Sequence, residues 1–135
     1  MRVIAGVLAG LCAAGAAAAQ EEVWFRSPTG NIHCAIIGGD WTTARCDLRQ
    51  FSPSFPNPPP DCELDWGYGF EVAITGPAAP ICAGDTVQMP GSTILDYGRS
   101  VTLGGITCSS ARTGMTCVNR EGHGFTVARA EQSVF

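Results

Sequence analysis

One order of motifs occurs twice in this sequence, and it restricts the fold more than any other feature. Each copy begins with a Gly-x-Ile-x-Cys string, continues to a second cysteine and then reaches a Gly-x-Gly-Phe string. The strings lie at 30–34 and 67–70 in copy one and at 104–108 and 122–125 in copy two, and the second cysteines are Cys46 and Cys117. Copy one is longer, because it has a longer loop between its cysteines and a proline-rich insert. Loops between strands tolerate added chain, so the repeat predicts two equivalent units that differ in their loops.

The N-terminal segment has the pattern of a secretory signal peptide. Arg2 is followed by an apolar run over residues 3–19 that ends in alanines. A short charged region, an apolar core and small residues at the cleavage site are typical of such a signal. An uncleaved anchor is the alternative, but the run is short for a membrane span and rich in Ala and Gly. We therefore expect a signal peptide over residues 1–19 and a protein that is secreted or periplasmic.

The size and charge of the remaining chain exclude several classes of function. Residues 20–135 are enough for one domain. They contain seven arginines, no lysine and 12 acidic residues, which gives a net charge of −5. An acidic surface repels phosphate backbones, so we expect no nucleic acid partner. The missing lysine excludes Schiff-base chemistry and a P-loop. No stretch after the signal is apolar and long enough to span a membrane.

Six cysteines remain after the signal, and an even number in a small exported domain indicates disulfides. The repeat makes the two cysteines of copy one equivalent to the two of copy two, so we expect each pair to bond within its copy. A zinc site is the competing interpretation. Structural zinc sites usually place two to four residues between paired cysteines, whereas the closest pair here has eight. We therefore expect no metal ion, no cofactor and three disulfides: Cys34–Cys46, Cys62–Cys82 and Cys108–Cys117.

Alternating apolar and polar residues indicate short strands in the mature chain. The longest alternation covers residues 62–75, and shorter ones cover 32–36, 106–108, 115–117 and 125–127. No segment after the signal has the 3.6-residue period of a helix, while 17 glycines and 9 prolines punctuate the chain. The predicted fold class is all-β, with two pseudo-equivalent three-stranded meanders packed as a small sandwich or barrel. The side chains predicted to be largely buried are Trp66, Phe70, Val72, Phe125 and Val127.

The same patterns divide the mature domain into parts. Copy one covers residues 24–75 and contains the proline-rich insert at 51–60, and copy two covers 102–135. Proline lacks a backbone donor, so the insert is expected to be an extended loop and not a strand. The linker over 76–101 is expected to add a hairpin that turns at 89–92, where the sequence reads Met-Pro-Gly-Ser.

Three carboxylates and two histidines are the candidates for catalysis. Asp61, Glu63 and Asp65 occupy alternate positions, which fits either a glycosidase carboxylate pair or a solvated strand face. His33 is expected on the outer face of its strand, because Ile32 and Cys34 point inward. His123 is expected to be a partly buried, hydrogen-bonded ring. No nucleophile motif accompanies either histidine, and we assign no catalytic residue.

The longer loops of copy one are the predicted binding surface, because the fold of copy two does without them. Trp41 lies in the first hairpin loop, and Phe51 and Phe55 lie among prolines that limit their mobility. Rigid aromatic side chains lose little entropy on docking and suit the role of anchors. Arg45 is a possible polar contact, or else the partner of Asp47 in a weak surface pair. The alternative is that Trp41 and the two phenylalanines fold onto the domain and cover an open end.

Several strings in this order resemble a family of small secreted domains found in actinobacteria and proteobacteria. The resemblance covers nearly all of the mature chain and implies an exported bacterial domain, but it supplies no activity and no catalytic residues. The strings are Ser27-Pro28-x-Gly30-Asn31-Ile32-x-Cys34, Arg45-Cys46-Asp47, Asp65-Trp66-Gly67, Cys82-Ala83-Gly84-Asp85-Thr86, Leu95-x-Tyr97-Gly98 and Gly122-His123-Gly124-Phe125.

These observations favour an exported, non-catalytic domain that binds a protein or a component of the cell envelope. The reasons are a disulfide-bonded β scaffold, loops of unequal length and the lack of a catalytic signature. The alternative is a small secreted hydrolase that uses the carboxylates near Asp61 to Asp65. A cleft around one of these carboxylates would favour the enzyme.

Overall fold

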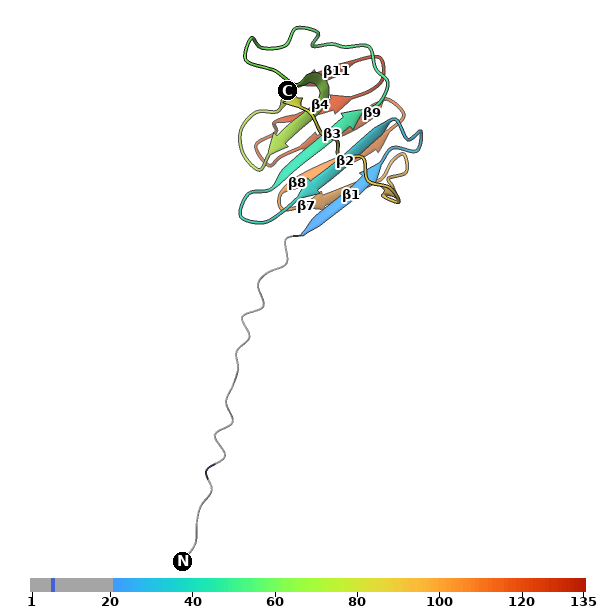
Figure 1. Cartoon of the computed structure of the whole chain (residues 1–135). Helices are drawn as coiled ribbons and strands as arrows, with labels where there is room; N and C mark the ends of the chain where they lie inside the picture. The colour runs from blue at the N-terminus through green and yellow to red at the C-terminus, as the bar shows by residue number, and fades with distance from the viewer. Residues whose placement is uncertain (1–5, 7–20) are drawn as a thin grey trace, which may run out of the picture.

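The described part of the chain folds into two β-sheets (Figure 1). The structure is a computed structural model, and it describes residue 6 and residues 21–135. Sheet A has six strands in the order β5 (Ala79–Ala83), β4 (Asp65–Ala73), β3 (Thr43–Leu48), β2 (Ile32–Ile37), β1 (Glu22–Arg26) and β6 (Thr93–Ile94). Sheet B has five strands in the order β11 (Gln132–Val134), β10 (Gly124–Val127), β9 (Gly114–Val118), β8 (Ile106–Ala111) and β7 (Ser100–Leu103). The predicted all-β class is confirmed, and the arrangement is a sandwich.

Each of the two predicted copies forms three consecutive antiparallel strands. Copy one supplies β2, β3 and β4 in sheet A, and copy two supplies β8, β9 and β10 in sheet B. The other strands extend these meanders at their edges. The predicted signal segment over 1–19 lies outside the described residues except for residue 6. In the part of the chain that the structure describes, no helix is long and apolar enough to cross a membrane.

The repeated Gly-x-Gly-Phe string has the same structural role in both sheets. Its first glycine, Gly67 or Gly122, has a φ of +81° or +83°, which favours a residue without a Cβ. Its phenylalanine, Phe70 or Phe125, is fully buried, and the two ring centroids lie 6.1 Å apart. At Gly124 an added Cβ would collide with the carbonyl oxygen of the neighbouring β9. The string therefore places one aromatic ring from each sheet at the centre of the core.

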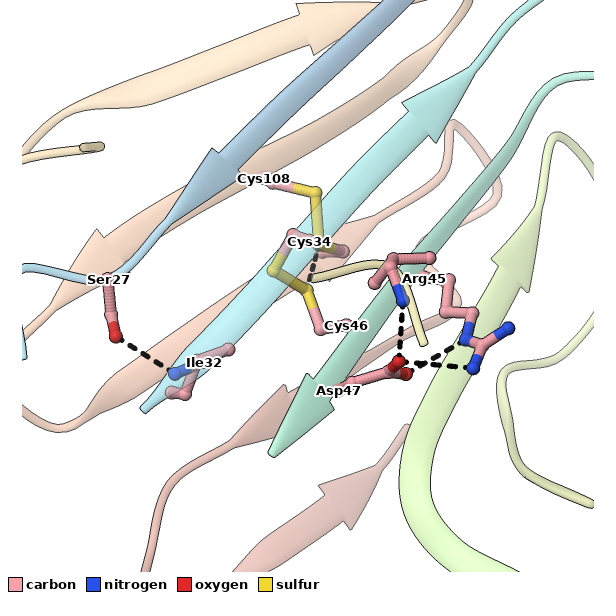
Figure 2. Close-up of a disulfide and its surroundings, with 9 residues drawn as sticks. Ser27, Ile32, Cys34, Arg45, Cys46, Asp47 and Cys108 are labelled. Atoms are coloured by element: carbon pink, nitrogen blue, oxygen red, sulfur yellow. Dashed lines mark hydrogen bonds and ion pairs between the residues drawn. A yellow bond between two sulfur atoms is a disulfide. The ribbon is translucent and has the colours of Figure 1, made fainter. Parts of the chain in front are cut away.

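Two disulfides lie in contact at the centre of the core. Cys34–Cys46 joins directly opposite residues of β2 and β3, and Cys108–Cys117 does the same in β8 and β9. All four cysteines are at most 1% exposed. The sulfur of Cys46 lies 3.7 Å from that of Cys117, so one bond packs on the other across the sheets. Figure 2 shows Cys108 facing the bond of sheet A. The meanders are thus bonded internally and touch through sulfur.

The linker between the copies crosses the outer face of sheet A. β5 and β6 lie at opposite edges of the sheet, so residues 84–92, here the crossover segment, pass over the strands between them (Figure 1). The Val87 N–H donates to Asp47 of β3 at 2.9 Å, and Arg26 of β1 donates to the Ser92 carbonyl at 2.6 Å. A turn is present where expected, but the predicted hairpin is wrong. The crossover segment forms no strand, and β6 pairs in parallel with β1.

The proline-rich insert closes one side of the sandwich. The Ser52 N–H donates to the Arg129 carbonyl at 2.8 Å. Ser54 and Gln132 exchange two hydrogen bonds of 2.9 Å each. These contacts join the chain after β3 of sheet A to the chain around β10 and β11 of sheet B. The insert contains no strand, as expected from its prolines.

The two phenylalanines of the insert face the core. Phe51 and Phe55 are half-buried and pack against the core cluster, and the Phe55 ring lies 5.6 Å from that of Phe70 in an edge-on arrangement. After the insert, the Cys62–Cys82 disulfide ties the chain to β5. The three bonds in the structure are the three pairs expected from the sequence. This packing matches the structural alternative for the two phenylalanines.

The alternation predicted for residues 62–75 breaks near the start of β4. Phe70 and Val72 are at most 1% exposed, as are Phe125 and Val127, but Trp66 is only half-buried. The register between β4 and β5 shifts between Trp66 and Phe70. A bulge of this kind changes which face a side chain points to. The prediction of one continuous apolar face is therefore wrong before Phe70.

Candidate functional site

A cavity of about 410 Å³ lies between the two sheets at one end of the sandwich. Sheet A contributes the turn between β1 and β2 and residues 49–50 after β3. Sheet B contributes Ala111, Arg112 and Gly114 at the turn from β8 to β9, and residues 128–129 after β10. Tyr97, from the connection between β6 and β7, completes the lining. Because the wall comes from loops of both sheets, the cavity exists only when the sandwich is assembled.

The turn between β1 and β2 is a tightly bonded wall of this cavity. The Ser27 carbonyl accepts from the Gly30 N–H at 2.9 Å, and the Ser27 hydroxyl accepts from the Ile32 N–H at 3.1 Å, which Figure 2 draws. The amide side chain of Asn31 bonds the backbone of Gln50 twice, at 2.8 and 2.9 Å. These bonds give Ser27 and Asn31 structural roles in the turn, and they fix the backbone next to Arg49.

Three arginines, all of them exposed, are among the residues that line the cavity: Arg49, Arg112 and Arg129. No Asp or Glu lines the cavity. Among the described residues, none of the three guanidinium groups forms an ion pair or donates a hydrogen bond, whereas Arg45 does both. The guanidinium of Arg112 stacks on the Tyr97 ring at 4.8 Å from its centroid. A protein with a net charge of −4 thus concentrates positive charge in one cavity.

None of these three arginines was among the site residues predicted from the sequence. Their common signal is position, because Arg49, Arg112 and Arg129 each follow the end of a strand within two residues. The strands concerned, β3, β8 and β10, all end at the same end of the sandwich. This signal requires the strand directions in both sheets, and the arginines lie outside the repeated strings.

The residues predicted to form a binding surface do not lie together. Trp41 is 59% exposed in the loop between β2 and β3. Phe51 follows β3, so it lies at the opposite end of the strands, and its ring and that of Phe55 pack inward. Arg45 lies in the middle of β3. The structure therefore leaves Trp41 as the exposed member of the four.

Arg45 is bound to neighbours within the fold. Its Nε and Nη2 contact the two carboxylate oxygens of Asp47 at 2.8 and 3.0 Å, and Nη1 contacts Asp85 at 2.9 Å (Figure 2 shows the pair with Asp47). The side chains of Arg45 and Asp47 are 14% and 5% exposed. The expectation of a weak surface pair is therefore wrong, because the crossover segment covers this part of sheet A.

Burial and charge shift the pKa values of Arg45, Asp85 and Tyr68 in this network. Burial opposes the charge of Arg45, but the hydrogen bonds that Arg45 donates to Asp47 and Asp85 outweigh this effect and raise the Arg45 pKa. The hydrogen bond from Arg45 and the charge of its guanidinium hold the pKa of Asp85 below its usual value. Burial raises the pKa of Tyr68, whose hydroxyl bonds the Asp85 backbone and accepts from Arg45. Since every donor group of Arg45 already has a partner, the network holds the crossover segment in place.

His33 lies behind the cavity wall. It follows the turn between β1 and β2, its ring Nε2 lies 2.9 Å from the Gly30 carbonyl, and the side chain is only 5% exposed. It stands on the outer face as expected, but it is buried. Its Nδ1 has no hydrogen-bond partner in the described structure. Burial lowers the pKa of His33, and the charges of Arg49 and Arg26 lower it further, while the Gly30 bond and Asp47 act in the opposite direction.

We expect His33 to make folding stability depend on pH. Its pKa is lower in the folded state, so below about 6.5 the unfolded chain binds the proton first and stability falls as the pH drops. One such group contributes a slope of at most about 1.4 kcal/mol per pH unit. Urea unfolding of His33→Gln should show a weaker loss of stability between pH 7.5 and 5 than the unsubstituted protein. His123→Gln is the control, and equal slopes in all three proteins would contradict the assignment.

The other candidates for catalysis lie away from the cavity. Asp61, Glu63 and Asp65 are exposed around the start of β4, and none of them lines it. His123 is half-buried in the turn between β9 and β10, and within residues 21–135 its ring makes no hydrogen bond, contrary to expectation.

Comparison with curated proteins and with solved structures gave no match. One family model matches, and it covers residues 4–135, which is almost the whole chain. The family is described only as one of unknown function, so the match adds no catalytic or binding residue. The chain therefore belongs to DUF6636, a family of unknown function.

Proposed function

We propose that this protein is an exported, non-catalytic binding domain whose ligand is an anion held in the arginine-lined cavity. The observation that carries the proposal is the convergence of Arg49, Arg112 and Arg129 on one cavity without an acidic residue in its lining. The guanidinium group binds carboxylates and phosphates through two parallel hydrogen bonds, and it stays charged at any physiological pH. A concave site with a few polar groups is also the usual form of a small-molecule site.

Export is supported by the disulfides. All six cysteines of the described chain are bonded in pairs, and such bonds persist in oxidising compartments. The amino-terminal pattern of the sequence points the same way. The binding site that we propose differs from the aromatic surface expected from the sequence. Trp41 is retained as a candidate contact for a protein partner, because it is exposed at the other end of the sandwich.

Nuclear magnetic resonance titration tests the proposed site. The ¹⁵N-labelled protein without residues 1–19 is titrated with sodium phosphate and with sodium citrate at constant ionic strength. We expect amide shifts to concentrate in residues 27–31, 49–50, 111–114 and 128–129. A charge-assisted hydrogen bond contributes about 1.5–3 kcal/mol, so Arg112→Gln should weaken binding of the better anion at least about tenfold.

The matched control is Arg120→Gln, because Arg120 is an exposed arginine at the opposite end of the sandwich, beside Gly105. It has the same change in net charge and should bind like the unsubstituted protein. Equal weakening by both substitutions would show that only overall charge matters. A lack of localised shifts with either anion would overturn the proposed function.

A further inference from the structure

We infer that the cavity is specific for a small multivalent anion, a molecule with two or more carboxylate or phosphate groups that both sheets hold at once. This inference rests on the proposed function and specifies its ligand. It depends on three features of the cavity: the origin of its cations, the state of its neutral polar groups and its volume.

The cations come from both sheets. Arg49 follows β3 of sheet A, whereas Arg112 and Arg129 follow β8 and β10 of sheet B. Their backbones are fixed, since the Arg49 N–H donates to the Asn31 carbonyl at 2.9 Å and the Arg129 carbonyl accepts from Ser52 at 2.8 Å. One anionic group can form a two-bond contact with one guanidinium. A ligand with two or more such groups can therefore pair with arginines of both sheets through separate groups.

Three of the five neutral polar side chains of the lining already have partners, whereas those of Gln50 and Tyr97 form no side-chain hydrogen bond within the described residues. The hydroxyls of Ser27 and Thr29 bond each other at 3.1 Å and also accept from backbone N–H groups. The amide of Asn31 uses both its oxygen and its nitrogen on the backbone of Gln50. A neutral sugar needs free groups of this kind to bind its hydroxyls. The three arginines outnumber the two neutral side chains that are still free, which favours charge over hydroxyl groups in the ligand.

The volume limits the size of the ligand. A cavity of about 410 Å³ falls in the range that encloses a small organic molecule. The stack of Arg112 on Tyr97 holds one guanidinium as a flat surface whose edge still carries N–H donors. A polycarboxylate of few carbons and a diphosphate both fit these conditions, and they differ in the geometry of the anionic group.

Isothermal titration calorimetry at fixed ionic strength and pH 7.5 tests the inference with matched anions. The carboxylate series is acetate, succinate and citrate, and the phosphate series is inorganic phosphate and pyrophosphate. We expect the multivalent members of at least one series to bind at least about tenfold more tightly than its monovalent or smallest member, which corresponds to about 1.4 kcal/mol. The stronger series identifies the anionic group.

Substitutions on opposite sheets distinguish the outcomes. Arg49→Gln and Arg129→Gln should each reduce the affinity for the best multivalent anion about tenfold. Each should also reduce the ratio of this affinity to the affinity for the smallest anion of the same series. Arg120→Gln should change neither. Equal affinity for large and small anions at the cavity would overturn multivalence and leave the proposed function intact. No binding of any anion would overturn both, and binding only of an anionic polymer such as polygalacturonate would overturn the assignment to a small ligand.

Discussion

Asp47→Ala is expected to lower the free energy of unfolding by about 3–5 kcal/mol, the usual loss when one partner of a buried ion pair is removed. The carboxylate is 5% exposed and accepts from both Arg45 and the Val87 N–H. Its removal would leave a largely buried guanidinium with one exposed carboxylate, that of Asp85, as its only anionic partner, and would leave the buried Val87 N–H without a partner. Urea unfolding at pH 7 measures the loss.

Asp85→Ala provides the matched control, because it removes the other carboxylate that contacts Arg45. The Asp85 side chain is 78% exposed, and an ion pair with such an exposed group contributes little to stability. A loss from Asp47→Ala no larger than that from Asp85→Ala would contradict the view that the buried pair anchors the crossover segment.

Phe125→Ala is expected to cost about 3–5 kcal/mol, as for other aromatic side chains truncated in a core. The Phe125 side chain is fully buried, and its ring faces that of Phe70 across the two sheets. Its removal would leave a cavity beside two packed disulfides. Because these disulfides cross-link the strands, the strands cannot easily shift to fill the cavity. Thermal and urea unfolding measure the loss.

Phe135→Ala removes the same side chain where it is 51% exposed. We expect a loss of about 1 kcal/mol or less there, since most surface substitutions have small effects. If Phe125→Ala also cost less than about 1 kcal/mol, the inward orientation of β10 would be wrong.

The fold was predictable where the sequence repeats itself. The positions of Cys46 and Phe70 could be inferred because each has a counterpart in the other copy, and a side chain's face follows from strand alternation. The alternation failed at Trp66, before Phe70, since a bulge in β4 is produced by pairing with β5 and leaves no mark in the apolar pattern. The hairpin prediction for the linker failed for a similar reason. The turn at 89–92 was visible in the sequence. The strand that follows it, β6, pairs with β1, and β1 is remote in the sequence.

The candidate site was not predictable from local patterns. Arg49 and Arg112 lie 63 positions apart in the chain by their numbers and come together only because two sheets pack face to face. The aromatic residues that were predicted to form a binding surface do not line this cavity. The proline-rich insert closes the sandwich, so Phe51 and Phe55 pack against the core instead of projecting into solvent. Charged residues that follow different strands can be assigned to one site only when the strand order and directions are known. Apolar periodicity is a local pattern and can be identified directly in the sequence.

The crossover segment also imposes an order on folding. It joins strands at opposite edges of sheet A, so its contacts with Asp47 and Arg26 have a place to form only after the strands between those edges have paired. Contacts between residues remote in sequence must first overcome the entropy of closing the chain between them, and they form slowly for that reason. The meander of copy one can assemble from neighbouring hairpins, and the crossover segment then settles over it as a late step. We therefore expect β1 to β5 of sheet A to pair before the crossover segment fixes the path that leads to β6 and on into sheet B.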